Sequence, residues 1–135
     1  MSSKKIERDE NKISVSPLLL NRIFQSVLER KFTEAERNLE KIRAKIEKKD
    51  IGEFERGFMR GLTGIILMHR SNSPDTFLNN LNPKNTKVLK KYYEEFSKNA
   101  ENKLHAPYDR GYFSALTEYM RFMVKRAKPS RKTKK

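Results

Sequence analysis

The sequence lacks cysteine and tryptophan entirely, and it has only two histidines, five glycines and five prolines in 135 residues. Without cysteine there is no disulfide framework, thiolate nucleophile, zinc finger or iron–sulfur cluster. The two histidines, His69 and His105, lie far apart, with no carboxylate at the spacing of a metal partner. Glycine-rich phosphate loops and Ser/His/Asp arrangements are also missing. These absences predict a protein that is not an enzyme and that uses no metal, cofactor or small-molecule substrate.

Long hydrophobic runs are absent as well. The longest, Leu62–Met68, is bounded by Arg60 and His69 and is too short to cross a bilayer. Residues 1–14 are polar, and they lack the apolar stretch of a signal peptide. The sequence therefore predicts a short flexible lead over residues 1–15, no membrane segment and a cytoplasmic location.

Positive charge is what the sequence has in excess. Lysine and arginine number 31 against 17 acidic residues, which gives a formal net charge of +14. Residues 121–135 hold eight basic residues and no acidic one, so all the acidic residues share the first 120 positions. Pro129 ends any helix that enters this region, and no apolar residue follows it. We expect residues 127–135 to form a basic tail that stays disordered until a polyanion orders it.

Helix signals recur along the chain, whereas no stretch alternates apolar and polar residues as a strand does. The first predicted helix spans 18–30, the second opens near residue 33, and the third runs from about residue 50 to Arg70. Each of the three is preceded by a start signal, namely Ser16 before Pro17, Thr33 with Glu36, and Asp50 with Glu53.

The second part of the chain predicts three more helical segments. A short insert helix is expected over 74–81, and Asn82 with Pro83 opens a longer helix that reaches about Leu104. The break at His105–Pro107 precedes a last helix from Tyr108 to about Arg126. The predicted fold is an all-α bundle of about five helices in a single domain over 16–126.

The chain repeats itself at an offset of 54 residues. Phe54–Thr63 aligns with Tyr108–Thr117, with four identical positions and four more that keep their chemical class. We interpret residues 34–70 and 88–124 as two copies of a helix–turn–helix unit, with 18–30 as an extra helix and 74–81 as an insert.

The repeated motif contains glycines and acid–arginine pairs at matching positions. Because glycine disfavours helix interiors, its recurrence predicts tight helix packing, with a ligand or nucleic-acid contact as the alternative. We hypothesise that the two copies pack around a pseudo-two-fold axis, so that each arginine pairs with the acid of the other copy. The alternative is that the charged residues are solvated. The motif residues are Glu55, Arg56, Gly57 and Gly61 in the first copy, and Asp109, Arg110 and Gly111 in the second.

The pattern Phe32-x-x-Ala35-x-x-x-Leu39 resembles the aromatic and small positions around the turn of a tetratricopeptide-type helical hairpin, over residues 18–50. The cysteine-free composition, rich in Lys, Glu, Arg and Ile, looks like that of small basic archaeal proteins. This resemblance implies a tetratricopeptide-like scaffold that binds other macromolecules and carries no catalytic residues.

The charge distribution points to nucleic acid, because each phosphate neutralised by Lys or Arg releases condensed counterions. We predict a non-catalytic accessory protein that binds the RNA or DNA backbone through its C-terminal arm. A second cluster on one helix face either extends this surface or is simply solvated. Base stacking is a further alternative, although the aromatic residues mostly keep core periodicity. The candidate residues are Arg121, Lys125, Arg126, Lys128, Arg131, Lys132, Lys134 and Lys135 in the arm, and Lys84, Lys87 and Lys91 in the cluster.

The other class of function that fits is a protein-interaction adaptor, since helical-hairpin repeats present concave surfaces. Such an adaptor would be a small subunit of a larger assembly, for example a ribosomal or other ribonucleoprotein particle or a DNA replication complex. For His69 and His105 we expect a capping or surface role.

Overall fold

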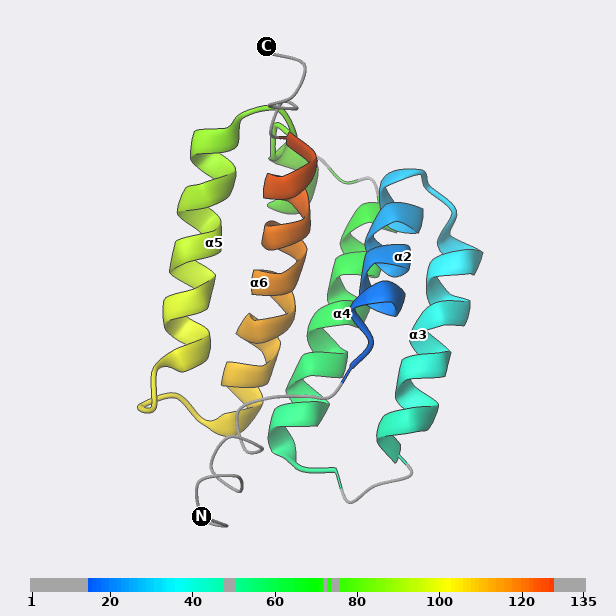
Figure 1. The fold of residues 1–135 in the computed structure, drawn as a ribbon, viewed down its shortest axis with the longest axis vertical. Coiled ribbons are helices and arrows are strands. Elements are labelled where there is room, and N and C mark those ends of the chain that lie inside the picture. Colours follow the sequence, from blue (N-terminus) through cyan, green and yellow to red (C-terminus); the bar gives the residue numbers. More distant parts are fainter. Residues whose placement is uncertain (1–14, 48–50, 72, 74–75, 128–135) are drawn as a thin grey trace.

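The fold is all-α, as predicted (Figure 1). The structure, a computed structural model, describes residues 15–47, 51–71, 73 and 76–127. The predicted lead up to residue 14 and the tail from residue 128 lie outside these residues. Within the described ranges there is no strand, and the elements are α2 (Pro17–Leu28), α3 (Phe32–Glu47), α4 (Glu53–Ser71), the 3-10 turn η1 (Leu78–Asn80), α5 (Thr86–Glu101) and α6 (Pro107–Ala127).

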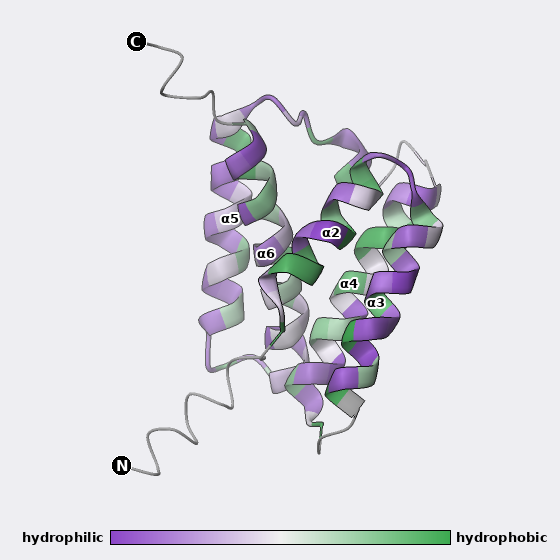
Figure 2. Cartoon of the chain, turned by 45° about the vertical axis from the view of Figure 1, so that its right-hand side comes forward, coloured by the Kyte–Doolittle hydropathy of each residue, from purple (hydrophilic) through white to green (hydrophobic). Residues whose placement is uncertain are grey.

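The two longest helices, α4 and α6, lie side by side at the centre and run in the same direction (Figure 1). Helix α5 packs against α6 on one side, and α3 packs against α4 on the other. Helix α2 packs mainly on α3 and also touches α4 and α6. Hydrophilic residues line the outward sides of the helices (Figure 2), while apolar residues from all of the elements form one core.

The start of α2 is confirmed, and the capping box predicted at Thr33 and Glu36 is wrong. The Ser16 hydroxyl accepts a hydrogen bond from the Leu19 backbone N–H at 3.3 Å, with a proline in the first turn. Helix α3 already begins at Phe32, so Thr33 lies inside its first turn. The Glu36 carboxylate is instead paired with Arg70 at the end of α4.

Helix α4 begins at Glu53, three residues after the predicted cap Asp50, which lies outside the described residues. The backbone N–H of Gly52 donates to Glu55 Oε1 at 2.9 Å. Glu55 thus reaches back to the residue that precedes the helix, which is one half of a capping box. The acid of the repeated motif therefore has a local structural role in the first copy.

Helix α5 begins three residues after the predicted Pro83 and ends at Glu101 rather than near Leu104. Asn85 is its N-cap, and the Asn85 side chain accepts from the Val88 N–H at 3.2 Å. Asn82 is instead the first residue of a turn, because the Asn85 N–H donates to the Asn82 carbonyl at 3.0 Å. Proline favours the second position of such a turn as much as the first turn of a helix.

The internal repeat appears as reciprocal contacts between α4 and α6. Helices α3 and α5, and likewise α4 and α6, begin 54 residues apart. A Cβ placed on Gly57 would lie 1.9 Å from the carbonyl oxygen of Tyr108, and a Cβ on Gly111 would lie 2.0 Å from that of Phe54. Each glycine therefore receives the backbone of the other helix at the equivalent position, as packing around a pseudo-two-fold axis requires.

The cross ion pairs proposed for this contact are wrong. Arg56 lies 3.7 Å from Glu53 on its own helix. Arg110 Nε donates to the Ala100 carbonyl at the end of α5, at 3.0 Å. The two helix backbones are in direct contact at the glycines. The arginine side chains of the motif therefore bind groups on their own helix or on the adjacent end of α5.

The segments interpreted as an extra helix and an insert correspond to each other in the structure. An offset of 54 residues places η1 opposite the last turns of α2. Gln25 of α2 accepts a hydrogen bond from Arg126 of α6 at 2.9 Å, and its counterpart Asn79 donates to the Met68 carbonyl of α4 at 3.1 Å. The first half (α2 to α4) thus begins with α2, which contacts the long helix α6 of the second half. The second half (η1 to α6) begins with η1, which contacts the long helix α4 of the first half and is only one turn long.

Candidate nucleic-acid interface

The last two turns of α6 present three exposed basic residues, Arg121, Lys125 and Arg126. Cations are favoured here because the carbonyl end of a helix carries partial negative charge. Arg121 NH2 lies 3.7 Å from Glu118 Oε2, and its guanidinium carbon lies 5.9 Å from the centre of the Tyr93 ring on α5. The predicted arm therefore begins on an ordered helix.

A hollow of about 330 Å³ lies between α2 and α6 beside these cations. The buried Leu20 and Phe24 and the half-buried Phe122 supply apolar surface, and the rim carries three cations and one acid. Sequence reasoning missed this site because it arises where α2 crosses α6. The lining residues are Pro17, Leu20, Asn21 and Phe24 from α2, and Glu118, Arg121, Phe122, Lys125 and Arg126 from α6.

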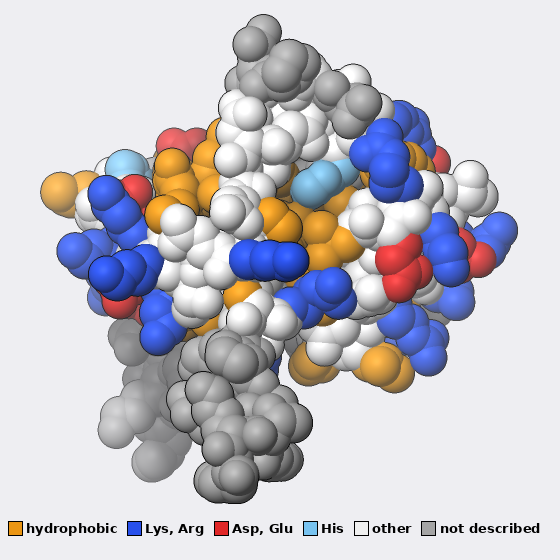
Figure 3. Space-filling model, turned by 90° about the horizontal axis from the view of Figure 1, so that it is seen from above, with side chains coloured by type: hydrophobic (Ala, Val, Ile, Leu, Met, Phe, Trp, Pro, Cys, Tyr) orange, Lys and Arg blue, Asp and Glu red, His pale blue; other side chains and the backbone are white. Residues whose placement is uncertain are grey.

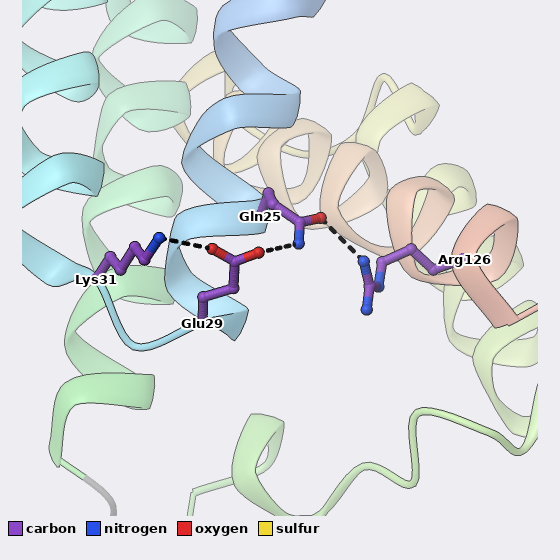
Figure 4. A network of polar contacts seen from close by, with 4 residues as sticks. All are labelled: Gln25, Glu29, Lys31 and Arg126. Atoms are coloured by element: carbon purple, nitrogen blue, oxygen red, sulfur yellow. Dashed lines mark hydrogen bonds and ion pairs between the residues drawn. The ribbon is translucent and has the colours of Figure 1, made fainter.

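Arg126 is held at the edge of the hollow by a chain of polar contacts (Figure 4). Its NH1 donates to Gln25 Oε1 at 2.9 Å, and Gln25 Nε2 donates to Glu29 Oε2 at 2.6 Å. Lys31 Nζ lies 3.3 Å from Glu29 Oε1. The hydrogen bond from Gln25, followed by the one from Lys31, lowers the pKa of Glu29 below its ordinary value. The guanidinium of Arg126 also lies over the Phe122 ring, 5.9 Å from its centre.

Below this surface, His69 of α4 meets Tyr119 of α6, with His69 Nε2 2.7 Å from the hydroxyl. Burial lowers the pKa of His69 to about 4, and the nearby charge of Arg30 adds to the effect. Burial also raises the pKa of Tyr119. His69 is therefore a neutral partner of an interior tyrosine rather than a cation at a helix end. The other histidine, His105, is bonded to Asn99 Oδ1 at 3.1 Å.

The lysine cluster predicted on one helix face is not arranged as expected. Lys84 lies in the turn before α5, so it cannot share a helix face with Lys87 and Lys91. The latter two are exposed and four residues apart on α5. The remaining candidates lie outside the described residues, namely Lys128, Arg131, Lys132, Lys134 and Lys135.

Seen from the end where α6 terminates, the described surface carries many more Lys and Arg side chains than acidic ones (Figure 3). None of the helices in the described ranges combines the length and apolarity that crossing a bilayer requires. That same part of the chain holds no group of three or more His, Asp or Glu side chains placed to bind a metal ion. Comparisons of the chain with protein-family models, with curated proteins and with solved structures found no match.

Proposed function

We propose that this protein is a non-catalytic accessory protein that binds the backbone of RNA or DNA through the end of α6 and the basic segment that follows it. The observation that carries the proposal is the distribution of charge, with eight basic residues and no acid in residues 121–135. The exposure of Arg121, Lys125 and Arg126 supports it, because these cations can meet phosphates without unfolding the helix.

Salt dependence tests this proposal, because counterion release gives a linear relation between the logarithms of affinity and salt concentration. Eight cations on duplex phosphates would give a slope of about −7. Deletion of residues 128–135 removes five of the eight cations. We expect the slope to fall to about −3 and the affinity at low salt to drop steeply.

A matched control separates a localised interface from general charge attraction. Lys125→Gln with Arg126→Gln removes two cations from the proposed surface. Lys41→Gln with Lys45→Gln removes two exposed cations from α3, which lies across α4 from α6 (Figure 1). Fluorescence anisotropy with labelled oligonucleotides should show weaker binding for the first pair only. Equal effects of the two pairs, or no binding by the full chain at low salt, would contradict the proposal.

The adaptor function is the second candidate, and one exposed residue favours it. Leu104, in the turn between α5 and α6, is 94% exposed. Covering this apolar side chain with another protein would remove its surface from water, which is favourable. Deletion of residues 128–135 distinguishes the two functions, since an adaptor would still capture its protein partner at full strength without the basic segment, whereas the affinity for a polyanion would drop steeply.

A further inference from the structure

We infer that the hollow between α2 and α6 takes one base of a single-stranded nucleic acid while the surrounding cations hold its phosphates. This inference rests on the proposed function, and it adds the strandedness of the ligand and the place where a base binds. Its basis is the combination of apolar floor, basic rim and size at one place on the surface.

The floor of the hollow has the chemistry of a base-stacking site. Phe122 is half-buried and lies against the buried Phe24, with ring centres 5.5 Å apart. The guanidinium of Arg126 lies over the same Phe122 ring. Bases stack both on aromatic rings and on arginine planes in proteins that bind single strands.

The rim supplies the charge that a phosphate backbone requires. Arg121, Lys125 and Arg126 face one acid, Glu118, so the hollow carries an excess of positive charge. Arg126 is fixed by Gln25 and Phe122, and Arg121 by Glu118 and Tyr93. Because these two guanidiniums are already ordered, little side-chain entropy is lost when a phosphate binds.

The size and position of the hollow favour a single strand over a duplex. At about 330 Å³ it lies near the lower end of the range for ligand pockets. One unpaired base can turn into such a space, whereas the bases of a duplex stay stacked inside the helix. The sequence that follows Ala127 adds five more basic residues, which favours binding of a polyanion.

Binding of the full chain to labelled U12, dT12 and a 12-base-pair duplex tests the inference. We expect both single strands to bind more tightly than the duplex. Phe122→Leu should weaken single-strand binding by about 10-fold, the loss typical of one stacked base, and should weaken duplex binding much less. A single 2-aminopurine in the strand should lose fluorescence on binding to the full chain and keep it with the variant.

A second variant guards against a folding defect in Phe122→Leu. Asn21 is exposed on α2 and lines the hollow, so Asn21→Met should occupy the space with a side chain that offers no ring for stacking and should not disturb the core. Its matched control is Ala44→Met, at an exposed site on α3. We expect Asn21→Met to weaken the preference for single strands and Ala44→Met to retain it.

The outcomes are separable. Equal affinity for single strands and duplex, unchanged by either hollow variant, would overturn the inference and leave the proposed function standing. Absence of binding to all three oligonucleotides would overturn the proposed function as well.

Discussion

Three glycines of α4 show how one residue type takes different roles in one helix. Gly57 and Gly61 face α6 so closely that an added Cβ would meet the Tyr108 carbonyl oxygen at 1.9 Å and the Ala115 Cβ at 2.6 Å. A Cβ on Gly64 would meet no described atom within 4 Å. The first two glycines therefore determine how closely the helices approach, and the third does not.

This difference predicts opposite effects of the same substitution. Gly57→Ala places a methyl group against a backbone oxygen that cannot move without shifting α6, so it should destabilise the protein by ~3 kcal/mol. Gly64→Ala should instead stabilise it by about 0.5–1 kcal/mol, because alanine favours a helix. Chemical denaturation of the two variants gives both values. A Gly57→Ala protein as stable as the wild type would show that the close contact is not required.

His69 makes stability depend on pH. Its pKa is about 4 in the folded protein and near 6.5 when the chain is unfolded, since burial and Arg30 disfavour the imidazolium. Between these values the unfolded chain binds more protons, so stability is highest above pH 6.5 and falls as the pH drops toward 4. His69→Gln should weaken this dependence relative to the wild type, as measured by denaturation at several pH values. An NMR titration that gives His69 an ordinary pKa would contradict the prediction.

At the scale of elements, the corner between α2 and α3 depends on an unusual residue. Arg30 has φ of 59°, in the left-handed region where glycine is favoured. The corner is closed by the Arg30 N–H on the Val27 carbonyl and the Lys31 N–H on the Ser26 carbonyl. The side chain of Arg30 makes contacts that offset the cost of this backbone conformation. Arg30 NH1 donates to the His69 carbonyl at 3.2 Å, and the guanidinium lies over the Phe32 ring.

The backbone strain at this corner can be separated from the side-chain contacts. Arg30→Ala and Arg30→Gly both remove the contacts, and only the glycine variant removes the strain. We therefore expect Arg30→Gly to be more stable than Arg30→Ala by about 1 kcal/mol in thermal or chemical unfolding. In both variants the pKa of His69 should rise, because the Arg30 charge is gone. Equal stability of the two variants would mean that the corner tolerates a left-handed alanine without cost.

Sequence patterns predicted the helices better than their starts, and α5 shows the reason. Asn82 and Asn85 are both suitable caps, and Pro83 suits a first helical turn and a β-turn equally. Only the packing of the preceding segment decides between them. The glycine spacing also predicted close helix packing. The hollow could not be predicted in this way, because it is formed by residues of α2 and α6 that lie about 100 positions apart in the sequence, as Gln25 and Arg126 do.

At the scale of the whole molecule, the two halves are packed unequally. In the first half, α2 covers α3, whose Leu39, Ile42 and Ile46 are buried. In the second half the corresponding segment is the single turn η1, and of the α5 residues only Leu89 is buried. Larger rings fill the space instead, since Phe77, Tyr92, Phe96 and Phe113 form a continuous series of aromatic contacts.

This asymmetry predicts that α5 unfolds locally more readily than α4 and α6. Helix α5 has few fully buried side chains, whereas α4 and α6 are in direct backbone contact through their glycines. Native-state hydrogen exchange should therefore show α5 amides exchanging by a partial opening of lower free energy than the amides of α4 and α6. Exchange of all three helices at one common free energy would indicate that the molecule opens only as a unit.

The reciprocal contacts of Gly57 and Gly111 also bear on how such units assemble. Each hairpin offers the other the same surface that it receives, so a single hairpin is complementary to itself. Two separate copies of such a unit would associate as an isologous homodimer. The present chain holds the two copies in one polypeptide, where one copy begins with the full helix α2 and the other with the single turn η1.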